Sequence, residues 1–221
     1  MVAKPGAPTY IKLMQINGFR LIPGALDRAA QAKLVALIGA VLEQAPPYRP
    51  ITPGGRAMSV LQSSFGPLGW TTDAAGYRYE PRHPVTGHPW PPMPPVLLDL
   101  RAREAGTDAP PPDSCLINLY QGGAKMGLHR DADEADQSLP VVSVSLGDTA
   151  VFRLGGLARS DPSVTVRLAS GDVCVLAGAA RLAFHGIDRV LTGSSQLVPG
   201  GGRINLTLRR AGPREGLAAS V

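Results

Sequence analysis

Residues 203–209 alternate strictly between polar and aliphatic side chains, and this pattern restricts the fold more than any other part of the chain. The segment reads RINLTLR, so in an extended strand the polar residues share one face and the aliphatic residues share the other. If the aliphatic face packs on the body of the protein, Arg203 and Arg209 point into a cavity. Buried guanidinium groups need anions, because an unpaired buried charge is very costly. The segment therefore predicts a strand that presents two arginines to a small dicarboxylate such as 2-oxoglutarate, whose carboxylates suit the planar guanidinium group.

A second polar face is expected on residues 114–120. Asn118 and Tyr120 alternate with aliphatic residues there, so in a strand the two side chains point the same way. Together with Asn205, which lies between the two arginines, they can add hydrogen bonds to the same dicarboxylate. We therefore count Asn118, Tyr120 and Asn205 among the residues expected to bind 2-oxoglutarate.

His129 and Asp131 are separated by a single residue, and a lone His185 follows far along the chain. In an extended strand His129 and Asp131 share a face, with Arg130 turned away. Two neutral imidazoles and one carboxylate form the facial triad that holds Fe(II) and leaves coordination positions open for oxygen and a chelating co-substrate. The combination predicts an oxidative iron centre rather than a hydrolytic one.

Each of these signals is weak when taken alone. An isolated His-x-Asp is usually a polar strand edge or a turn, a lone histidine is usually structural, and an alternating strand usually has a solvated outer face. Their joint occurrence favours the metal site. His-Arg-Asp also opens the catalytic loop of protein kinases, but Asp136 stands where that loop needs Asn, and the chain has no glycine-rich phosphate loop. The kinase hypothesis is therefore rejected.

Five stretches of the chain resemble the AlkB-type DNA alkylation-damage dioxygenases, in particular the bacterial members of that family. These stretches are LGWTTDAAGYRYEP (68–81), CLINLYQGGAKMGLHRDADE (115–134), PVVSVSLGDTAVFRLGGLARSDP (140–162), SGDVCVLAGAARLAFHGI (170–187) and GRINLTLRRAG (202–212). Together they extend over nearly the whole chain, from about residue 15 to residue 212. The combination of H-x-D, a remote H and R-x-N-x-T-x-R is specific, whereas any one piece is not.

The resemblance implies an Fe(II)- and 2-oxoglutarate-dependent dioxygenase that demethylates 1-methyladenine and 3-methylcytosine in DNA. Formaldehyde is released, and 2-oxoglutarate is converted to succinate and CO2. The iron ligands, which are also the catalytic residues, are then His129, Asp131 and His185. The resemblance favours Arg203 for the far carboxylate of 2-oxoglutarate and Arg209 for the carboxylate beside the iron.

The few aromatic residues of the chain are unevenly distributed. Four of them crowd into residues 70–90, namely Trp70, Tyr77, Tyr79 and Trp90. This clustering favours a binding surface over an evenly filled core, because flat rings stack on a base that has been extruded from the helix. The alternative is structural: Trp70 plugs the sheet and Tyr79 caps it.

The resemblance also assigns residues to the nucleic-acid substrate. It places Trp70 and Tyr77 in a nucleotide-recognition lid at about residues 46–95, and Asp133 near the exocyclic amino group of the damaged base. It further implies that Arg159 binds substrate. Methylated adenine and cytosine are cationic at neutral pH, so an indole face and a carboxylate both prefer the lesion to the normal base.

Three positions depart from the family pattern. Arg56 stands where bacterial relatives have an aromatic residue that meets the nucleic-acid strand, so we expect Arg56 to contact a phosphate instead. Arg130 replaces a neutral amide, and Ile204 replaces an aromatic residue. These changes leave strand preference and lesion range open, but they do not alter the expected chemistry.

Helical spacing of aliphatic residues predicts a helix over residues 27–44, and a second helix is expected at 96–105. Short segments separated by turn residues predict strands at 58–65, 114–120, 141–146, 150–154, 164–168, 172–177 and 202–209. This pattern indicates a mainly β fold with flanking helices, a double-stranded β-helix or jelly roll, which the resemblance also implies. We expect one domain at 15–212, a loosely held lead at 1–14 and a C-terminal tail at 213–221.

The net charge of +5 and the isoelectric point near 9.6 permit a polyanionic partner without proving one. We expect the partner to be alkylated DNA, preferably single-stranded, with RNA as an open alternative. The sequence contains no membrane span and no signal peptide, which predicts a cytoplasmic protein. Cys115 and Cys174 are then free thiols rather than a disulfide, and the protein is expected to act as a monomer.

Two other classes of function remain open from the sequence. An Fe(II)- and 2-oxoglutarate-dependent hydroxylase or demethylase that acts on RNA, a protein or a small molecule keeps the iron and arginine motifs. Of these, an enzyme acting on a protein or a small molecule needs no base-stacking lid. A non-catalytic jelly-roll binding module has histidines with only structural roles. Loss of base stacking in Trp70→Ala, tested with methylated oligonucleotides, would argue against a protein or small-molecule substrate. Absence of iron-dependent succinate formation would favour the binding module.

Overall fold

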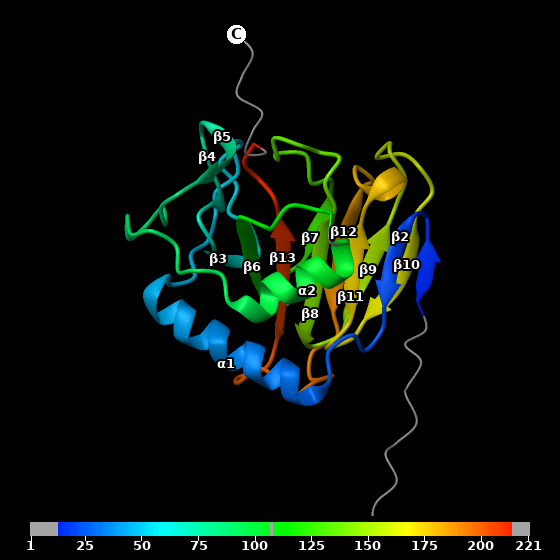
Figure 1. The fold of residues 1–221 in the computed structure, drawn as a ribbon, viewed down its shortest axis with the longest axis horizontal. Helices are drawn as coiled ribbons and strands as arrows, with labels where there is room; N and C mark the ends of the chain where they lie inside the picture. Colours follow the sequence, from blue (N-terminus) through cyan, green and yellow to red (C-terminus); the bar gives the residue numbers. More distant parts are fainter. Residues whose placement is uncertain (1–12, 107, 214–221) are drawn as a thin grey trace, which may run out of the picture.

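The computed structural model describes residues 13–106 and 108–213 (Figure 1). Its helices are α1 (Arg28–Gln44), α2 (Pro95–Ala105) and the 3-10 turn η1 (Gly178–Ala180). Its strands are β1 (Met14–Ile16), β2 (Phe19–Ile22), β3 (Leu61–Phe65), β4 (Gly69–Asp73), β5 (Gly76–Glu80), β6 (Ser114–Tyr120), β7 (Met126–His129), β8 (Val141–Gly147), β9 (Ala150–Leu154), β10 (Val164–Leu168), β11 (Val173–Leu176), β12 (His185–Val190) and β13 (Arg203–Arg209).

The strands form two larger antiparallel sheets and one hairpin. The seven-stranded sheet has the order β1-β2-β11-β8-β13-β6-β3, and the four-stranded sheet has the order β10-β9-β12-β7. The β4–β5 hairpin forms a separate two-stranded sheet, and its strand β4 lies against β3 and β6 of the seven-stranded sheet (Figure 1). Strands that are distant in sequence are neighbours in both sheets, as in a jelly roll. The predicted fold class is therefore confirmed.

Both main helices cover the seven-stranded sheet on its outer face (Figure 1). Helix α1 begins after Asp27, whose side chain accepts a hydrogen bond from the Ala30 amide at 2.8 Å, as an N-cap does. Its buried residues Leu34 and Ile38 belong to the same apolar cluster as Leu97 and others of α2 and the sheet. Within the described residues, neither helix is long and apolar enough to cross a membrane.

A second apolar cluster fills the space between the two sheets. It includes Phe19, Phe152, Leu154 and Ile187, which come from strands of both sheets. The polar face of β13 looks toward this inner space, while its aliphatic residues belong to the outer cluster under the helices. The chain thus places a row of polar side chains inside the sandwich, as the alternation of residues 203–209 predicts.

Several predicted elements are confirmed and others need correction. The helix predicted at 27–44 and the strand predicted at 202–209 agree with α1 and β13 to within one residue. The strand predicted at 58–65 begins only at Leu61. Asp131 does not lie in a strand with His129, because β7 ends at His129. The polypeptide after β7 is irregular, and Asp131 lies in this irregular segment, two residues after His129.

Six strands are absent from the predicted set, namely β1, β2, β4, β5, β7 and β12, although an extended segment was expected at His129. They are short and carry weak period-two patterns, so their pairing partners define them. Met14 belongs to β1 and not to a loose lead, and the rest of the predicted lead lies largely outside the described residues. Of the predicted tail, only residue 213 is described. Cys115 and Cys174 are buried free thiols, as predicted.

Candidate metal and co-substrate site

A cavity of about 630 Å³ opens into the sandwich. Its walls come from both sheets, the β4–β5 hairpin and the loop that follows β7. Its volume lies in the range of pockets that bind small molecules. Most of the site residues predicted from the sequence line it: Trp70, Tyr77, Asn118, Tyr120, His129, Asp131, Asp133, Arg159, His185, Arg203, Asn205 and Arg209. Arg56 does not, and it lies exposed on the surface.

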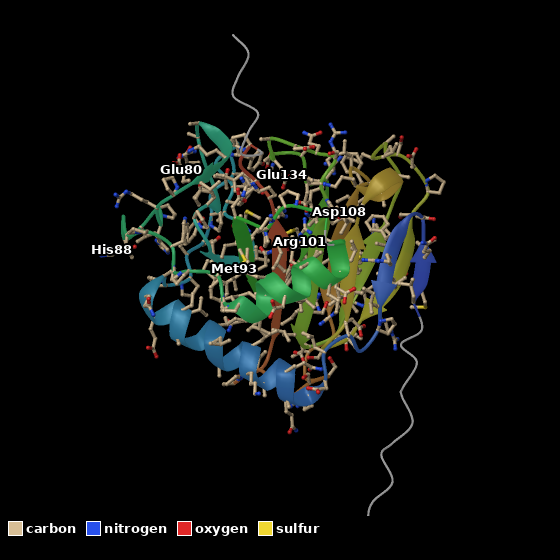
Figure 2. All side chains as sticks on the ribbon, viewed as in Figure 1. Glu80, His88, Met93, Arg101, Asp108 and Glu134 are labelled. Carbon is tan, nitrogen blue, oxygen red and sulfur yellow. The ribbon has the colours of Figure 1, made fainter. Side chains whose placement is uncertain are left out.

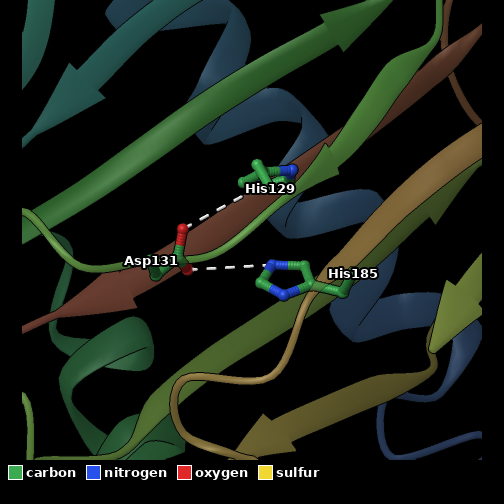
Figure 3. A group of neighbouring side chains, drawn as sticks. All are labelled: His129, Asp131 and His185. Atoms are coloured by element: carbon green, nitrogen blue, oxygen red, sulfur yellow. Dashed lines mark ion pairs between the residues drawn. The ribbon is translucent and has the colours of Figure 1, made fainter. Parts of the chain in front are cut away.

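His129, Asp131 and His185 gather in this cavity (Figure 3). His129 is the last residue of β7 and His185 the first of β12, and the two are directly paired across the sheet. Asp131 lies 3.9 Å from Nε2 of His129 and 4.0 Å from Nε2 of His185, measured to its nearest oxygens. One ligand atom from each of the three residues lies within 4.8 Å of the others. Strand pairing therefore brings the distant histidine to the H-x-D segment.

The two imidazoles are oriented by the backbone. Nδ1 of His129 lies 3.0 Å from the Gly127 carbonyl oxygen, and Nδ1 of His185 lies 3.0 Å from that of Ala183. A proton on each Nδ1 satisfies these contacts. It leaves the lone pair of each Nε2 atom available to coordinate a metal ion. Metal-bound histidines usually make this outer hydrogen bond, which fixes the tautomer and the plane of the ring.

The protonation states also suit a metal. Burial, together with the nearby charge of His129, lowers the pKa of His185 to about 4, so this imidazole is neutral at physiological pH. Burial alone raises the pKa of Asp131, but Arg209 and the two histidines outweigh it and hold the pKa of the carboxyl well below its usual range. Two imidazole nitrogens and an ionised carboxylate are the donor set that fits Fe(II).

Arg203 is a buried cation inside the sandwich and has no ion-paired carboxylate among the described residues. It is 2% exposed, and Nη2 donates a hydrogen bond to Oγ of Ser145 at 2.9 Å. Nε has no partner among the described residues. Burial lowers the pKa of Arg203 to about 10, and Tyr120 opposes that shift. The hydroxyl of Tyr120 makes only a weak contact with the sulfur of Met126, at 3.9 Å. A carboxylate between Arg203 and Tyr120 would satisfy both groups.

Arg209 has carboxylate partners already. Its Nη2 lies 2.8 Å from Oδ1 of Asp131, and its Nε lies 3.1 Å from Oε1 of Glu134. Burial alone lowers the pKa of Arg209, but these carboxylates outweigh it and raise the pKa above its usual range. Arg209 therefore has anionic partners within the protein, and its expected contact with 2-oxoglutarate stays a prediction.

Asn118 and Asn205 lie in the cavity wall but are engaged with other side chains. Nδ2 of Asn118 donates to Oδ1 of Asn205 at 3.4 Å, and Oδ1 of Asn118 accepts from Gln62 at 2.8 Å. Nδ2 of Asn205 donates to Oγ of Ser143 at 2.8 Å. This polar row joins neighbouring strands, so these amides shape the wall between the two arginines of β13.

The aromatic residues of the predicted lid divide into two groups. The rings of Trp70 and Tyr77 stack at 5.5 Å between centroids with an angle of 18°, and both line the cavity. Nε1 of Trp70 donates to Oδ2 of Asp133 at 2.8 Å. Trp90, in contrast, is buried against Gly69 and donates to the Glu80 carbonyl oxygen. The clustering in the sequence therefore combines a cavity rim with ordinary core packing.

Two guanidinium groups lie over one ring at the cavity. The Cζ atoms of Arg130 and Arg159 are 5.6 Å and 4.9 Å from the ring centroid of Phe184, within the range of cation–π contacts. Both arginines are exposed and line the cavity. They add positive charge beside the metal ligands and the Trp70 indole.

The family model described as the 2OG-Fe(II) oxygenase superfamily matches residues 18–209. The chain is 60% identical over 211 residues to an alpha-ketoglutarate-dependent dioxygenase AlkB homolog from Caulobacter vibrioides, covering 96% of this chain and 92% of the relative. It is 46% identical over 189 residues to the alpha-ketoglutarate-dependent dioxygenase AlkB of Escherichia coli, covering 84% and 87%. The chain belongs to the AlkB family of 2OG-Fe(II) oxygenases. It is an Fe(II)- and 2-oxoglutarate-dependent dioxygenase.

The solved structure of OsALKBH1 supports the assignment to the AlkB family. It superimposes with a TM-score of 0.78 at 29% identity, over 90% of this chain and 100% of that chain. The double-stranded β-helix is thus shared along nearly the full length of the domain.

Two residues of this AlkB-family site were missed from the sequence. Glu134 and Arg181 are buried, paired with each other, and in contact with Asp131 or its partner Arg209. Glu134 stands in a run of charged residues, which usually indicates a solvated loop. Arg181 stands alone in an apolar stretch. Only an isolated charge among apolar residues hinted at burial, and it gave no indication of a partner.

Proposed function

We propose that this AlkB-family dioxygenase demethylates cationic N-alkylated bases in DNA, with 1-methyladenine and 3-methylcytosine as its main substrates. Formaldehyde is released, and 2-oxoglutarate becomes succinate and CO2. One observation carries the proposal: a single cavity contains the His-Asp-His cluster and the unpaired Arg203, and the stacked Trp70–Tyr77 pair borders it. The cavity thus contains ligand atoms for a metal ion, a cation for a dicarboxylate, and an aromatic surface for a flat base.

His129, Asp131 and His185 are proposed to hold the iron. Fe(II) held there would activate O2, which would oxidise 2-oxoglutarate to succinate and CO2 and place its second oxygen atom on the N-methyl carbon; the resulting hemiaminal would then lose formaldehyde. The protein orients the three ligands through the backbone contacts of the two Nδ1 atoms. Because Asp131 is buried and ionised, it contributes a negative charge that water does not screen.

Arg203 and Tyr120 are proposed to bind the far carboxylate of 2-oxoglutarate. A bidentate ion pair with the guanidinium group supports this assignment, because it would satisfy the buried Nε that has no partner among the described residues. Asn118 and Asn205 line the wall between the arginines and limit the length of the ligand. Arg209, held beside Asp131, is proposed to contact the carboxylate next to the metal.

Trp70 is proposed to stack on the flipped base. Tyr77 covers one face of the indole, which leaves the other face for the base. Oδ2 of Asp133 accepts from the indole, and Oδ1 is proposed to accept from the exocyclic amino group. Arg159 and Arg56, with Arg130 beside Arg159, are proposed to contact phosphates of the bound strand.

The substrate strand is proposed to be single-stranded by preference, because the target base must leave any duplex before it reaches the cavity. RNA is an alternative substrate of the same chemistry. The protein is proposed to act as a monomer in the cytoplasm. The positive net charge supports binding of a polyanion.

The test is formaldehyde release from oligonucleotides that contain one 1-methyladenine or one 3-methylcytosine, after anaerobic loading with Fe(II) and 2-oxoglutarate. We expect one formaldehyde and one succinate per repaired base, and none without Fe(II). Succinate formation without repair of either oligonucleotide would instead favour a hydroxylase of proteins or small molecules. No iron-dependent succinate at all would favour a binding module. Trp70→Ala should reduce repair without reducing metal binding.

A further inference from the structure

Glu134 lies buried beside the β4–β5 hairpin, where Figure 2 labels it. Its Oε2 accepts a hydrogen bond from Nη2 of Arg181 at 2.9 Å. Its Oε1 accepts from the hydroxyl of Tyr79 at 2.8 Å and lies 3.1 Å from Nε of Arg209. Both oxygens of this carboxylate are therefore engaged, and the side chain is only 2% exposed.

Arg181 uses each of its three nitrogens for a different acceptor. Nη2 binds Glu134, Nη1 donates to the carbonyl oxygen of Asp131 at 2.6 Å, and Nε donates to that of Leu139 at 2.6 Å. The guanidinium group is as deeply buried as its partner. It lies just after η1, four residues before His185. Arg181 thus joins the segment that leads to His185 with the backbone of Asp131.

These contacts restrain Asp131 from two sides. Arg181 holds its carbonyl group, while Glu134 holds Arg209, which in turn binds the Asp131 carboxylate. A fully buried ion pair rarely stabilises a fold more than apolar residues of the same volume do. Stability alone therefore gives little reason to place two charges here, whereas the acceptors of Arg181 point to a role at the metal site.

We propose that Glu134 and Arg181 are positioning residues that pre-organise the metal site without touching the metal. They fix the orientation of Asp131 and the course of the chain into His185, so that the three ligand atoms converge before a metal binds. This inference rests on the proposed metal ligands. Outer contacts of this kind change metal affinity by roughly 10- to 100-fold when they are removed.

The experiment measures binding of Mn²⁺ to the metal-free full-length protein by calorimetry, with Co²⁺ visible absorption as a second probe of coordination geometry. We expect Glu134→Gln and Arg181→Met to raise the Kd for Mn²⁺ by roughly 10- to 100-fold and to change the Co²⁺ spectrum. Arg181→Lys keeps the charge but cannot reach all three acceptors, so its loss of affinity should be smaller than that of Arg181→Met. This graded order is the signature of positioning.

Asp113→Asn is the matched control. Asp113 is a buried carboxylate that accepts from the amides of Ala211 and Gly212, outside the metal site. The Mn²⁺ affinity of the Asp113→Asn variant should match that of the unmodified protein, even if the variant unfolds at a lower temperature. Equal Mn²⁺ affinities in all folded variants would overturn the positioning role. Failure of the unmodified protein to bind Mn²⁺ would overturn the metal assignment itself.

Discussion

Arg203 and Arg209 stand at opposite ends of β13, on the same face and at similar burial of 2% and 6%. Arg209 lies between the carboxylates of Asp131 and Glu134. Arg203 donates only to the Ser145 hydroxyl and the Asp148 carbonyl oxygen, and its Nε has no partner among the described residues. Their pKa values move in opposite directions for this reason. Arg209 is neutralised by carboxylates of the protein, whereas Arg203 needs an anion from a ligand.

This difference assigns separate tasks to two residues that look equivalent in the sequence. The Arg209 end organises the metal ligands with charges that belong to the protein. The Arg203 end keeps a buried cation that has no ion-paired carboxylate among the described residues, which is tolerated where a ligand supplies the missing charge. A buried charge without a partner thus indicates a ligand-binding site, whereas a buried charge with protein partners indicates a structural role.

The largest effect is expected when the metal cluster at the Arg209 end is broken. His129→Ala, Asp131→Ala and His185→Ala should each abolish turnover, because a three-ligand site has no spare ligand. The fold should remain, since its core is apolar. Formaldehyde release and far-ultraviolet circular dichroism check the two parts. Near-normal repair by any one of the three variants would mean that the triad is wrong.

Stability should separate the two arginines next. Arg209→Met leaves the buried Asp131 carboxylate without its arginine and Glu134 with Arg181 alone, so we expect the metal-free protein to lose about 3–5 kcal/mol of unfolding free energy. Arg203→Met removes a buried charge that lacks an anion, and its effect should stay within about 1 kcal/mol. Urea unfolding measures both. Equal losses of unfolding free energy in the two variants would show that the different surroundings of Arg203 and Arg209 do not affect stability.

The pH dependence of unfolding sharpens the same comparison. The pKa of His185 is about 4 in the folded protein, against 6.5 for a free histidine. As the pH falls below 6.5 the unfolded chain takes up the proton first, so the metal-free protein should lose stability between pH 6.5 and 4. The loss is on the order of 3 kcal/mol. His185→Gln should flatten this slope, and the exposed His88→Gln should not. An unchanged slope in His185→Gln would contradict the assignment.

A smaller effect is expected at the rim of the cavity. If Trp70 and Asp133 recognise a cationic base, 1-methyladenine and 3-methylcytosine should be repaired faster than the neutral 1-methylguanine and 3-methylthymine. Asp133→Asn should narrow the gap by slowing the cationic pair, by roughly ten- to a hundredfold. Competition between the four oligonucleotides at neutral pH measures the ratio. Equal rates for charged and neutral lesions in the unmodified enzyme would refute electrostatic recognition.

Some of this molecule could be predicted from its sequence because the signals are local. The alternation of residues 203–209 predicts β13, and the helical spacing of residues 27–44 predicts α1. The H-x-D segment identifies His129 and Asp131 as a pair, although the predicted strand ends at His129 and Asp131 lies in the irregular segment after it. Each of these features depends on neighbours within a few positions.

The parts that were missed depend on contacts between distant segments. His185 was predicted as a ligand, but the pairing of β12 with β7 that brings it to His129 was not. Glu134 and Arg181 are 47 positions apart, and nothing in the sequence indicates that they are paired. The alternation also made Arg203 and Arg209 equivalent, since a period of two says which face a side chain takes and nothing about its partner.

The most direct test of the contrast along β13 is calorimetric titration of 2-oxoglutarate into the Mn²⁺-loaded protein without oxygen turnover. The unmodified protein should bind one equivalent. Arg203→Met should weaken binding by roughly 10- to 100-fold, because one charge-assisted carboxylate contact is lost, while its Mn²⁺ affinity stays unchanged. Equal affinity for 2-oxoglutarate in Arg203→Met and the unmodified protein would show that the unpaired arginine is not the co-substrate anchor.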